Sequence, residues 1–242
     1  MAMNSTYNFH VKRSVREIFD KIAESYAYTR LKPWNIVLKP INFGTKVFGD
    51  MGCGPGQNIQ FILEKSEKIR VIGVDISRKM LVIAAKRLKK RGLYGRTDLV
   101  EADLEFLPFR DNAFHGLAYI ASIHHLPSRE ARLRTILEAK RVLKPNGKVI
   151  VTVWALFQKR FLKEILKRAI LKLLGKEESI RDIYVPWRYK GGTYRRYYHL
   201  FTPWELKSLI RSAGLVLLEY GGFRIKSKLL AENYFVLGCK WR

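Results

Sequence analysis

Apolar residues follow two alternating patterns along the middle of the chain. Short apolar runs, typical of buried strands, occur at residues 46–51, 70–76, 97–103, 113–122 and 147–154. Between these runs, apolar positions recur every three to four residues, which predicts amphipathic helices at residues 56–66, 77–91 and 128–143. Apolar strands that alternate with helices predict a parallel sheet covered by helices on both faces.

Further elements are predicted before and after this region. Helical spacing of apolar residues indicates an amphipathic helix over residues 14–26. After residue 154, we expect a basic amphipathic helix at 157–174, a loop at 178–199, a helix at 202–214 and strands at 214–223 and 233–241. The last two strands are joined by a short connection, so an antiparallel hairpin at the end of the sheet is expected. We expect one domain over residues 1–242, with a helical cap at 1–45 and a substrate-recognition insertion at 155–201 that contains the basic helix.

The composition excludes a disordered chain and adds a strong positive charge. Hydrophobic residues make up 48% of the 242 residues, which is enough for a full-sized core. Lysine and arginine total 46 against 21 acidic residues, so the net charge is +25. This excess indicates a polyanionic partner, either nucleic acid or an anionic membrane. A basic protein without such a partner is the remaining interpretation.

The two cysteines, Cys53 and Cys239, form no CxxC pair, which excludes a disulfide framework and gives no reason to expect a metal site. Residues 1–19 lack the apolar segment of a signal peptide. No apolar run reaches the roughly 18 residues of a membrane span. We therefore expect a soluble, cytoplasmic protein with reduced thiols and no membrane span.

A glycine-rich turn follows the first predicted strand. Gly52, Gly54 and Gly56 allow the backbone to turn sharply and approach a ligand, and the next helix adds free N–H groups at its start. A dinucleotide-binding loop needs a further glycine at position 57, where this chain has Gln57. Asp50, which precedes the turn, can stabilise a cationic ligand.

Two more acids follow the next two strands. Asp75 ends the second strand, where a carboxylate can accept hydrogen bonds from both hydroxyls of a ribose. Asp103 ends the third strand and can accept a hydrogen bond from an exocyclic adenine amine. Together with Asp50 and the glycine turn, these acids predict a site for an adenosine that carries an amino acid with ammonium and sulfonium charges.

The order of these motifs resembles the class I S-adenosylmethionine-dependent methyltransferases. The resemblance rests on D-x-G-C-G-x-G at residues 50–56, followed by VDIS, LPF, HHL and VLKPNGKVIV. It implies a doubly wound, mostly parallel, seven-stranded Rossmann-like α/β sheet and S-adenosylmethionine as cofactor. In that family the glycine turn holds the methionine part. The implied cofactor-binding residues are Asp50, Gly52, Gly54, Gly56, Asp75, Asp103, Leu104 and Ala121.

Five further blocks resemble one branch of that family, the tRNA wobble-uridine carboxyl-methyltransferases. They are TRLKPW, SIHHLPSREAR, VWAL, DIYVPW and RYYHLF, within residues 29–201. The resemblance implies tRNA as partner and esterification of the carboxylate of 5-carboxymethyluridine at the wobble position. It also implies a small zinc-binding activator protein that pairs along a sheet edge, and residues 97–103 are a candidate edge.

Esterification of a carboxylate needs no general base, because the nucleophile is ionised at neutral pH. The protein must align the reacting atoms and exclude water. Arg30 and Arg196 are candidates to hold the carboxylate bidentately. His124 and His125 follow the fourth strand, and one of them can hydrogen-bond the carboxylate or the uracil, although such histidines are often structural. Arg30 can alternatively cap the first helix.

Aromatic and basic residues complete the candidate substrate site. Trp154 ends the fifth strand and can stack the base, and Tyr197 and Tyr198 are expected to have one buried and one free ring. The predicted catalytic residues are Arg30, His125, Trp154, Arg196 and His199. The predicted substrate-binding residues are His124, Trp187, Tyr198, Lys159, Arg160, Arg188 and Arg195.

Three interpretations remain open for the basic helix at 157–174. It can contact the phosphate backbone of RNA, lie in a membrane interface, or form a solvated face over the sheet. The membrane reading accompanies an alternative activity, that of a small-molecule or lipid methyltransferase with the same fold. A third hypothesis is a non-catalytic tRNA-binding scaffold.

Overall fold

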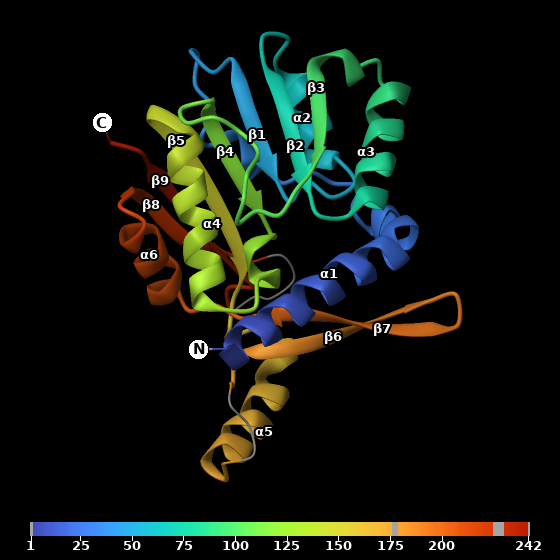
Figure 1. Cartoon of the computed structure of the whole chain (residues 1–242), viewed down its shortest axis with the longest axis vertical. Helices are drawn as coiled ribbons and strands as arrows, with labels where there is room; N and C mark the ends of the chain where they lie inside the picture. Colours follow the sequence, from blue (N-terminus) through green and yellow to red (C-terminus); the bar gives the residue numbers. More distant parts are fainter. Residues whose placement is uncertain (1, 176–178, 225–229, 242) are drawn as a thin grey trace.

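The structure, a computed structural model, describes residues 2–175, 179–224 and 230–241 (Figure 1). Its centre is a seven-stranded sheet with the strand order β3-β2-β1-β4-β5-β9-β8. Neighbouring strands from β3 to β5 pair in parallel, and β9 is antiparallel to both β5 and β8. The strands are β1 (Val47–Met51), β2 (Arg70–Asp75), β3 (Thr97–Glu101), β4 (Phe114–Ile120), β5 (Leu143–Trp154), β8 (Val216–Phe223) and β9 (Asn233–Cys239). The doubly wound, mostly parallel sheet and its terminal antiparallel hairpin are confirmed, and β3 is an edge strand.

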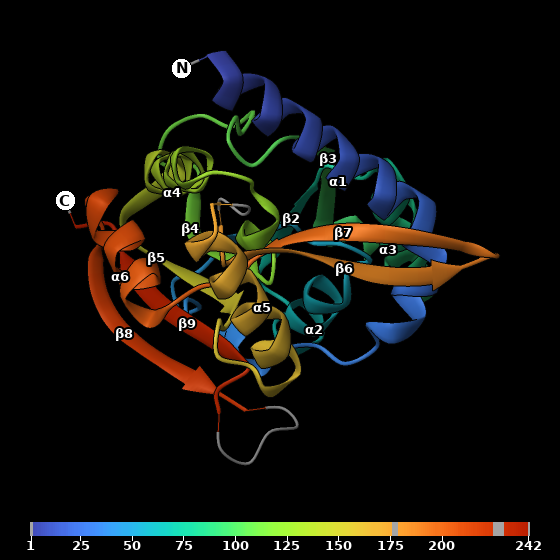
Figure 2. The same ribbon diagram turned by 90° about the horizontal axis from the view of Figure 1, so that it is seen from below.

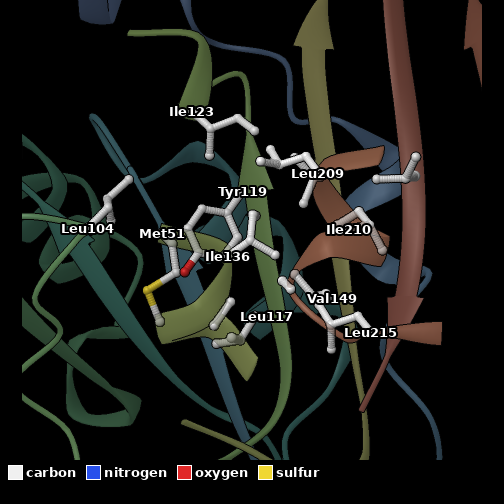
Figure 3. Packing of buried hydrophobic residues seen from close by; sticks show 14 of the residues in the cluster. Met51, Leu104, Leu117, Tyr119, Ile123, Ile136, Val149, Leu209, Ile210 and Leu215 are labelled. Atoms are coloured by element: carbon white, nitrogen blue, oxygen red, sulfur yellow. The ribbon is translucent and has the colours of Figure 1, made fainter. Parts of the chain in front are cut away.

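Helices cover both faces of this sheet. One face packs against α2 (Gln57–Lys65), α3 (Arg78–Lys90) and the short η1 (Asn35–Leu38). The other packs against α4 (Arg129–Val142) and α6 (Pro203–Ser212). Because successive strand residues point to opposite faces, Leu117 and Tyr119 of β4 join one core and Ala118 and Ile120 join the other. Figure 3 shows Tyr119 between Met51 and Ile136 in the larger core.

Outside the sheet, α1 (Ala2–Thr29) runs alongside a separate two-stranded hairpin, β6 (Asp182–Tyr189) and β7 (Gly192–His199) (Figures 1 and 2). A buried cluster of Val11, Val15 and Tyr197 joins α1 to β7. The remaining elements are η2 (Tyr94–Arg96), η3 (Ile123–His125), η4 (Lys159–Phe161) and α5 (Leu162–Leu173), the last of which projects from the body in Figure 1.

Several predicted boundaries and one element type differ from the structure. Residue 178 lies outside the described residues, but most of the segment predicted as a loop at 178–199 is the β6–β7 hairpin, closed by a turn in which Lys190 and Gly191 have positive φ. The helix predicted at 14–26 extends over 28 residues as α1. Tyr197 and Tyr198 are 2% and 1% exposed, so the expectation of one free ring was wrong: each face of β7 is covered.

None of the described helices, including the 28-residue α1, combines the length and the hydrophobicity that crossing a membrane requires.

Candidate functional site

The glycine turn connects β1 to α2 and leaves room for a ligand. Gly52, Gly54 and Gly56 all have positive φ, between 52° and 80°, a conformation that L side chains rarely adopt. A Cβ at Gly56 would lie 2.9 Å from Ala84 of α3, whereas a Cβ at Gly54 would meet nothing within 4 Å. A Cβ at Gly52 would clash with the side chain of Ser122, so close packing requires glycine at both Gly52 and Gly56, whereas Gly54 borders open space.

The three predicted acids lie around this turn in different environments. Asp75 accepts hydrogen bonds from the backbone N–H of Gly54 at 2.8 Å and of Ser77 at 2.9 Å. Asp50 is completely buried, and neither of its carboxylate oxygens has a hydrogen-bond partner among the described residues. Burial and the charge of Asp75 raise the pKa of Asp50 to about 7, and burial raises the pKa of Asp75 to about 6. Asp50 lines neither of the two cavities that adjoin the turn, but a buried, unpartnered carboxylate just before the glycine turn is compatible with the cationic amino group of the expected cofactor.

A cavity of about 100 Å³, which we name the first cavity, opens beside this turn. Predicted cofactor residues line it from four strand ends: Gly52, Gly54, Asp75, Asp103, Leu104 and Ala121. Lys12, Val15, Phe19 and Tyr26 of α1 line it as well, so α1 closes its other side. In this structure Lys12 Nζ lies 2.9 Å from Asp103 and also contacts Glu105. Asp103 thus binds an amine where the adenine amine is expected.

A second cavity of about 630 Å³ adjoins the first, since Tyr26, Gly52, Gly54 and Ala121 line both. Ala121 has a φ of +54°, an uncommon conformation for a residue with a side chain, at the point where β4 ends between the two cavities. The predicted residues Arg30, Trp154, Lys159 and Arg160 also line the second cavity.

Aromatic rings and guanidinium groups are stacked beside the second cavity. Trp154 and Tyr198 are parallel, with ring centroids 4.0 Å apart and an interplanar angle of 9°. The Arg160 guanidinium lies 4.1 Å from the Trp154 centroid, so it must occupy the opposite face of the indole. The prediction that a base stacks on Trp154 therefore requires Arg160 to move, because both faces of the ring are covered in this structure.

Arg196 lies behind these rings and does not line either cavity. It is 5% exposed, and its guanidinium carbon is 4.6 Å from the Trp187 ring and 6.0 Å from that of Tyr26. It donates a hydrogen bond to the Tyr198 hydroxyl at 2.7 Å, but its Nε has no partner among the described residues. A buried cation with an unused donor is poised to bind an anion.

The two adjacent histidines are held in place as neutral rings. Nδ1 of His125 lies 2.8 Å from the Tyr197 carbonyl, to which it donates, and His125 lines the first cavity. Nδ1 of His124 accepts from the backbone N–H of Trp154, and His124 is buried away from both cavities. Burial lowers the pKa of His125 to about 3 and that of His124 well below its usual value, so neither ring is charged at neutral pH.

The structure does not bring the other predicted residues to the cavities. His199 is bound on both ring nitrogens by Asp182 and Glu205, so we correct its predicted catalytic role. Trp187 faces α1, where its indole N–H donates to Ser25. Arg188 and Arg195 are exposed on the hairpin.

Sequence reasoning missed a set of residues that line the cavities. These include Lys12, Phe19 and Tyr26 from α1, Gln57 and Asn58 after the turn, and Glu232 and Asn233 at the start of β9. The missed α1 residues share one helical face, since Lys12, Phe19 and Tyr26 are seven residues apart, and this spacing was a usable signal.

Comparisons with known proteins agree with this geometry. A family model described as a methyltransferase domain matches residues 49–147, which run from β1 into β5. Two solved structures share the fold. The first is a SAM-dependent methyltransferase of Methanosarcina mazei, with a TM-score of 0.70 and 20% identity, covering 86% of this chain and 98% of that one. The second is a complex of the Haloferax volcanii Trm112 methyltransferase activator with a putative methyltransferase, with a TM-score of 0.64 and 16% identity, covering 94% of this chain and 98% of that one.

One relative comes from Schizosaccharomyces pombe. It is named tRNA (carboxymethyluridine(34)-5-O)-methyltransferase and is 31% identical over an alignment of 242 positions that covers 90% of this chain and 96% of that protein. This match covers more of the chain than the family model does. The chain therefore belongs to the tRNA (carboxymethyluridine(34)-5-O)-methyltransferase family and is a class I methyltransferase with S-adenosylmethionine as its cofactor.

Proposed function

We propose that this protein transfers a methyl group from S-adenosylmethionine to the carboxylate of 5-carboxymethyluridine at the wobble position of tRNA, which gives the methyl ester. The observation that carries the proposal is the group of three arginines, Arg30, Arg160 and Arg196, beside the second cavity. In the described part of the chain, none of the three has a carboxylate within ion-pair distance. Such a group favours an anionic substrate next to the methyl donor.

The chemistry matches this arrangement because no proton has to be removed from the nucleophile. A carboxylate is ionised at neutral pH, and the cofactor supplies a methyl group on a sulfonium, which is already a good leaving group. The neutral His125 needs no role as a base and can act as a hydrogen-bond acceptor through Nε2. The residues of the chain position the substrate and exclude water.

Different residues can position the carboxylate and the uracil ring of the substrate. We assign the carboxylate to Arg30, which lines the second cavity, and to Arg196 behind the Tyr26 and Tyr198 rings. We assign the uracil ring to the space beside Trp154, with Arg160 displaced on binding. His124 supports this wall through its bond to the Trp154 backbone.

The cofactor residues have equally distinct roles in the proposal. Asp75 would hold the ribose hydroxyls, Asp103 and Leu104 the adenine, and Asp50 the amino group, with Gly52, Gly54 and Gly56 shaping the methionine site. Residues 1–45 would act as the helical cap, because Val15, Phe19 and Tyr26 of α1 face the first cavity.

We assign the anticodon arm to the basic surface of residues 155–201. Arg188 and Arg195 lie on the exposed face of the hairpin, since Arg188 pairs with Thr193 and Arg195 with Pro186 on one side of the two strands. Lys159 and the exposed lysines of α5 extend this surface beside the second cavity. Such contacts with phosphates predict strong salt dependence of tRNA binding.

We also propose a partner and a compartment. The solved Haloferax volcanii complex pairs a methyltransferase of this fold with an activator protein. The β3 edge, whose outer side pairs with no described strand, offers a place for a small zinc-binding activator to add a strand. A tRNA substrate places the activity in the cytoplasm.

One observation favours the alternative of a lipid or small-molecule methyltransferase. Leu166, Ile170 and Leu173 of α5 are 64%, 52% and 88% exposed and form an apolar stripe on a projecting helix. This stripe is typical of helices that lie in a membrane interface.

The deciding experiment combines the protein with labelled S-adenosylmethionine and total tRNA, with and without a candidate activator, and then identifies the modified nucleoside by mass. We expect a methyl ester that alkali removes. Label in an organic-extractable product instead would favour the lipid alternative, and binding of tRNA without turnover in either assay would favour a scaffold. A parallel reaction with an Arg30→Ala variant tests whether the signal depends on the arginine group.

A further inference from the structure

The two faces of β7 have different surroundings. Arg196 and Tyr198 point toward Tyr26 and Trp154 beside the cavities. Because side chains alternate along a strand, Tyr197 and His199 lie on the other face. There the Tyr197 hydroxyl is hydrogen-bonded to Asp182 at 2.7 Å, and its ring packs against α1. β7 therefore carries the candidate anion site on one face, and its other face packs against α1 and is hydrogen-bonded to Asp182.

His199 is bound by a carboxylate at each ring nitrogen. Its Nδ1 lies 2.6 Å from Asp182, which is directly opposite on β6, and its Nε2 lies 2.9 Å from Glu205 at the start of α6. Ionised carboxylates only accept hydrogen bonds, so both ring nitrogens must donate. Only the imidazolium form carries a proton on both nitrogens, so this geometry requires a charged histidine.

The charges around His199 support ionised carboxylates. Burial alone would raise the pKa of Asp182, but hydrogen bonds from His199 and Tyr197 lower it to about 2. Arg181 donates to Glu205 at 2.8 Å, and Arg132 of α4 lies 3.6 Å from it. The pKa of Glu205 is also lowered, because the bonds from His199 and the two arginines outweigh its burial. We name Asp182, Tyr197, His199 and Glu205, with Arg132 and Arg181, the His199 cluster.

The His199 cluster is the polar junction between the hairpin and the sheet domain. It contains residues of β6, β7, α4 and α6, and the Tyr197 hydroxyl, whose single proton faces Asp182, also lies 3.1 Å from the Pro127 carbonyl that follows η3. Beyond β7, Phe201 forms a bridge to Ala155 and stacks edge-on against His199 at 4.9 Å. The orientation of the hairpin relative to the cavities therefore depends on this junction.

We propose that His199 is a positioning residue whose imidazolium, held between Asp182 and Glu205, fixes β7 so that Arg196 and Tyr198 stand beside the substrate cavity. The proposal rests on the proposed function for the identity of the substrate, but the charged state and the role in hairpin orientation do not. The glycine turn, Asp75 and Asp103 belong to the ends of β1, β2 and β3, which contribute no residue to the cluster, whereas Val15 and His125 of the first cavity contact Tyr197. We therefore expect cofactor binding to change much less than the tRNA reaction.

A neutral substitution would leave two carboxylates facing each other without the cation between them. We therefore expect His199→Gln to lower kcat/KM for tRNA about 10- to 100-fold, since a small displacement of Arg196 is enough to lose this much. The dissociation constant for S-adenosylhomocysteine should change less than twofold. His10→Gln, at an exposed histidine of α1, is the matched control and should leave both quantities unchanged.

A double variant distinguishes a role of the His199 charge from a role in packing alone. If the imidazolium compensates the two acids, adding Asp182→Asn to His199→Gln should recover part of the lost tRNA activity and thermal stability. A histidine that only fills space would give a double variant weaker than either single one, which would overturn the proposal.

A spectroscopic test works even if the tRNA reaction proves wrong. All five histidines are labelled with ¹⁵N, and the His199→Gln and His10→Gln variants identify the signals of His199 and His10. Both ring nitrogens of His199 should then have imidazolium shifts at pH 7.5. A neutral tautomer in the wild-type protein would overturn the proposal. Imidazolium shifts without any tRNA methylation would instead refute the proposed function and leave the role of His199 in the hairpin intact.

Discussion

The cofactor side and the substrate side of this protein are built in different ways. On the cofactor side, Asp50 and Asp75 lie at the ends of β1 and β2 and Asp103 follows β3, and parallel strands bring their carboxyl ends to the same edge. On the substrate side, Arg30, Trp154 and Arg196 come from elements more than 40 residues apart that meet only after α1 and the hairpin pack. The first kind of site can be read from sequence order, whereas the second depends on tertiary structure.

The two sides also have opposite charge. The buried Asp50 and the half-buried Asp75, both with raised pKa values, lie at the glycine turn. Arg30 and Arg160 line the second cavity on the other side of Ala121, and neither forms an ion pair among the described residues. This difference matches a cationic methyl donor and an anionic acceptor, and it leads to variants that should affect one side and not the other.

The largest expected effect is on the substrate side. Arg196→Gln removes a buried guanidinium, so it should lower kcat/KM for tRNA by about 100- to 1,000-fold while leaving calorimetric affinity for S-adenosylhomocysteine unchanged. Arg195→Gln, at the neighbouring exposed arginine, is the control. It should lower kcat/KM for tRNA only a few-fold, and the loss should depend on the salt concentration. Equal losses at the two positions would show that Arg196 contributes only general positive charge.

A smaller effect is expected from the cofactor side. Asp75→Ala should raise the dissociation constant for S-adenosylhomocysteine about 10- to 100-fold, because charged hydrogen bonds to the ribose are lost. Asp98→Ala, which removes an exposed acid of β3 paired with Arg70, is the matched control. Unchanged affinity in Asp75→Ala would contradict the assignment of the first cavity to adenosine.

The smallest effect concerns the pH dependence of cofactor affinity. Asp50 must be ionised to bind an amino group, and its pKa in the free protein is about 7, so affinity should fall as the pH drops below 7. A carboxyl group with a raised folded pKa favours folding while it is protonated. The free protein therefore loses this stability as the pH rises from about 4 to about 7.

Asp50→Asn tests the predicted effects of Asp50 ionisation on both stability and cofactor affinity, because the asparagine amide does not ionise. The variant should unfold at a higher temperature than the wild type at pH 8 without ligand, yet bind S-adenosylhomocysteine several-fold more weakly. Calorimetry and thermal unfolding measure the two quantities. A variant that is less stable at pH 8 would mean that Asp50 is already compensated in the free protein.

Sequence patterns predicted the sheet well because its strands are apolar on both faces. They failed on the hairpin because Pro186 and the Lys190–Gly192 turn resemble a loop, and its strands are rich in aromatic and basic residues rather than aliphatic ones. They also assigned His199 to the substrate, because no pattern reveals that Asp182, 17 residues earlier, lies opposite it. The wall formed by α1 was missed although Lys12, Phe19 and Tyr26 share one helical face, because the spacing does not tell which part of the sheet that face covers.

The central claim is that one pocket holds the methyl donor on an acidic side and a carboxylate on a basic side. The most direct test is a crystal structure with S-adenosylhomocysteine and an anticodon stem-loop that contains 5-carboxymethyluridine. We predict the amino group of the cofactor product near Asp50, and the carboxylate on Arg30 and Arg196 with one oxygen facing the sulfur. A carboxylate bound away from both arginines, or a cofactor product outside the first cavity, would contradict the account.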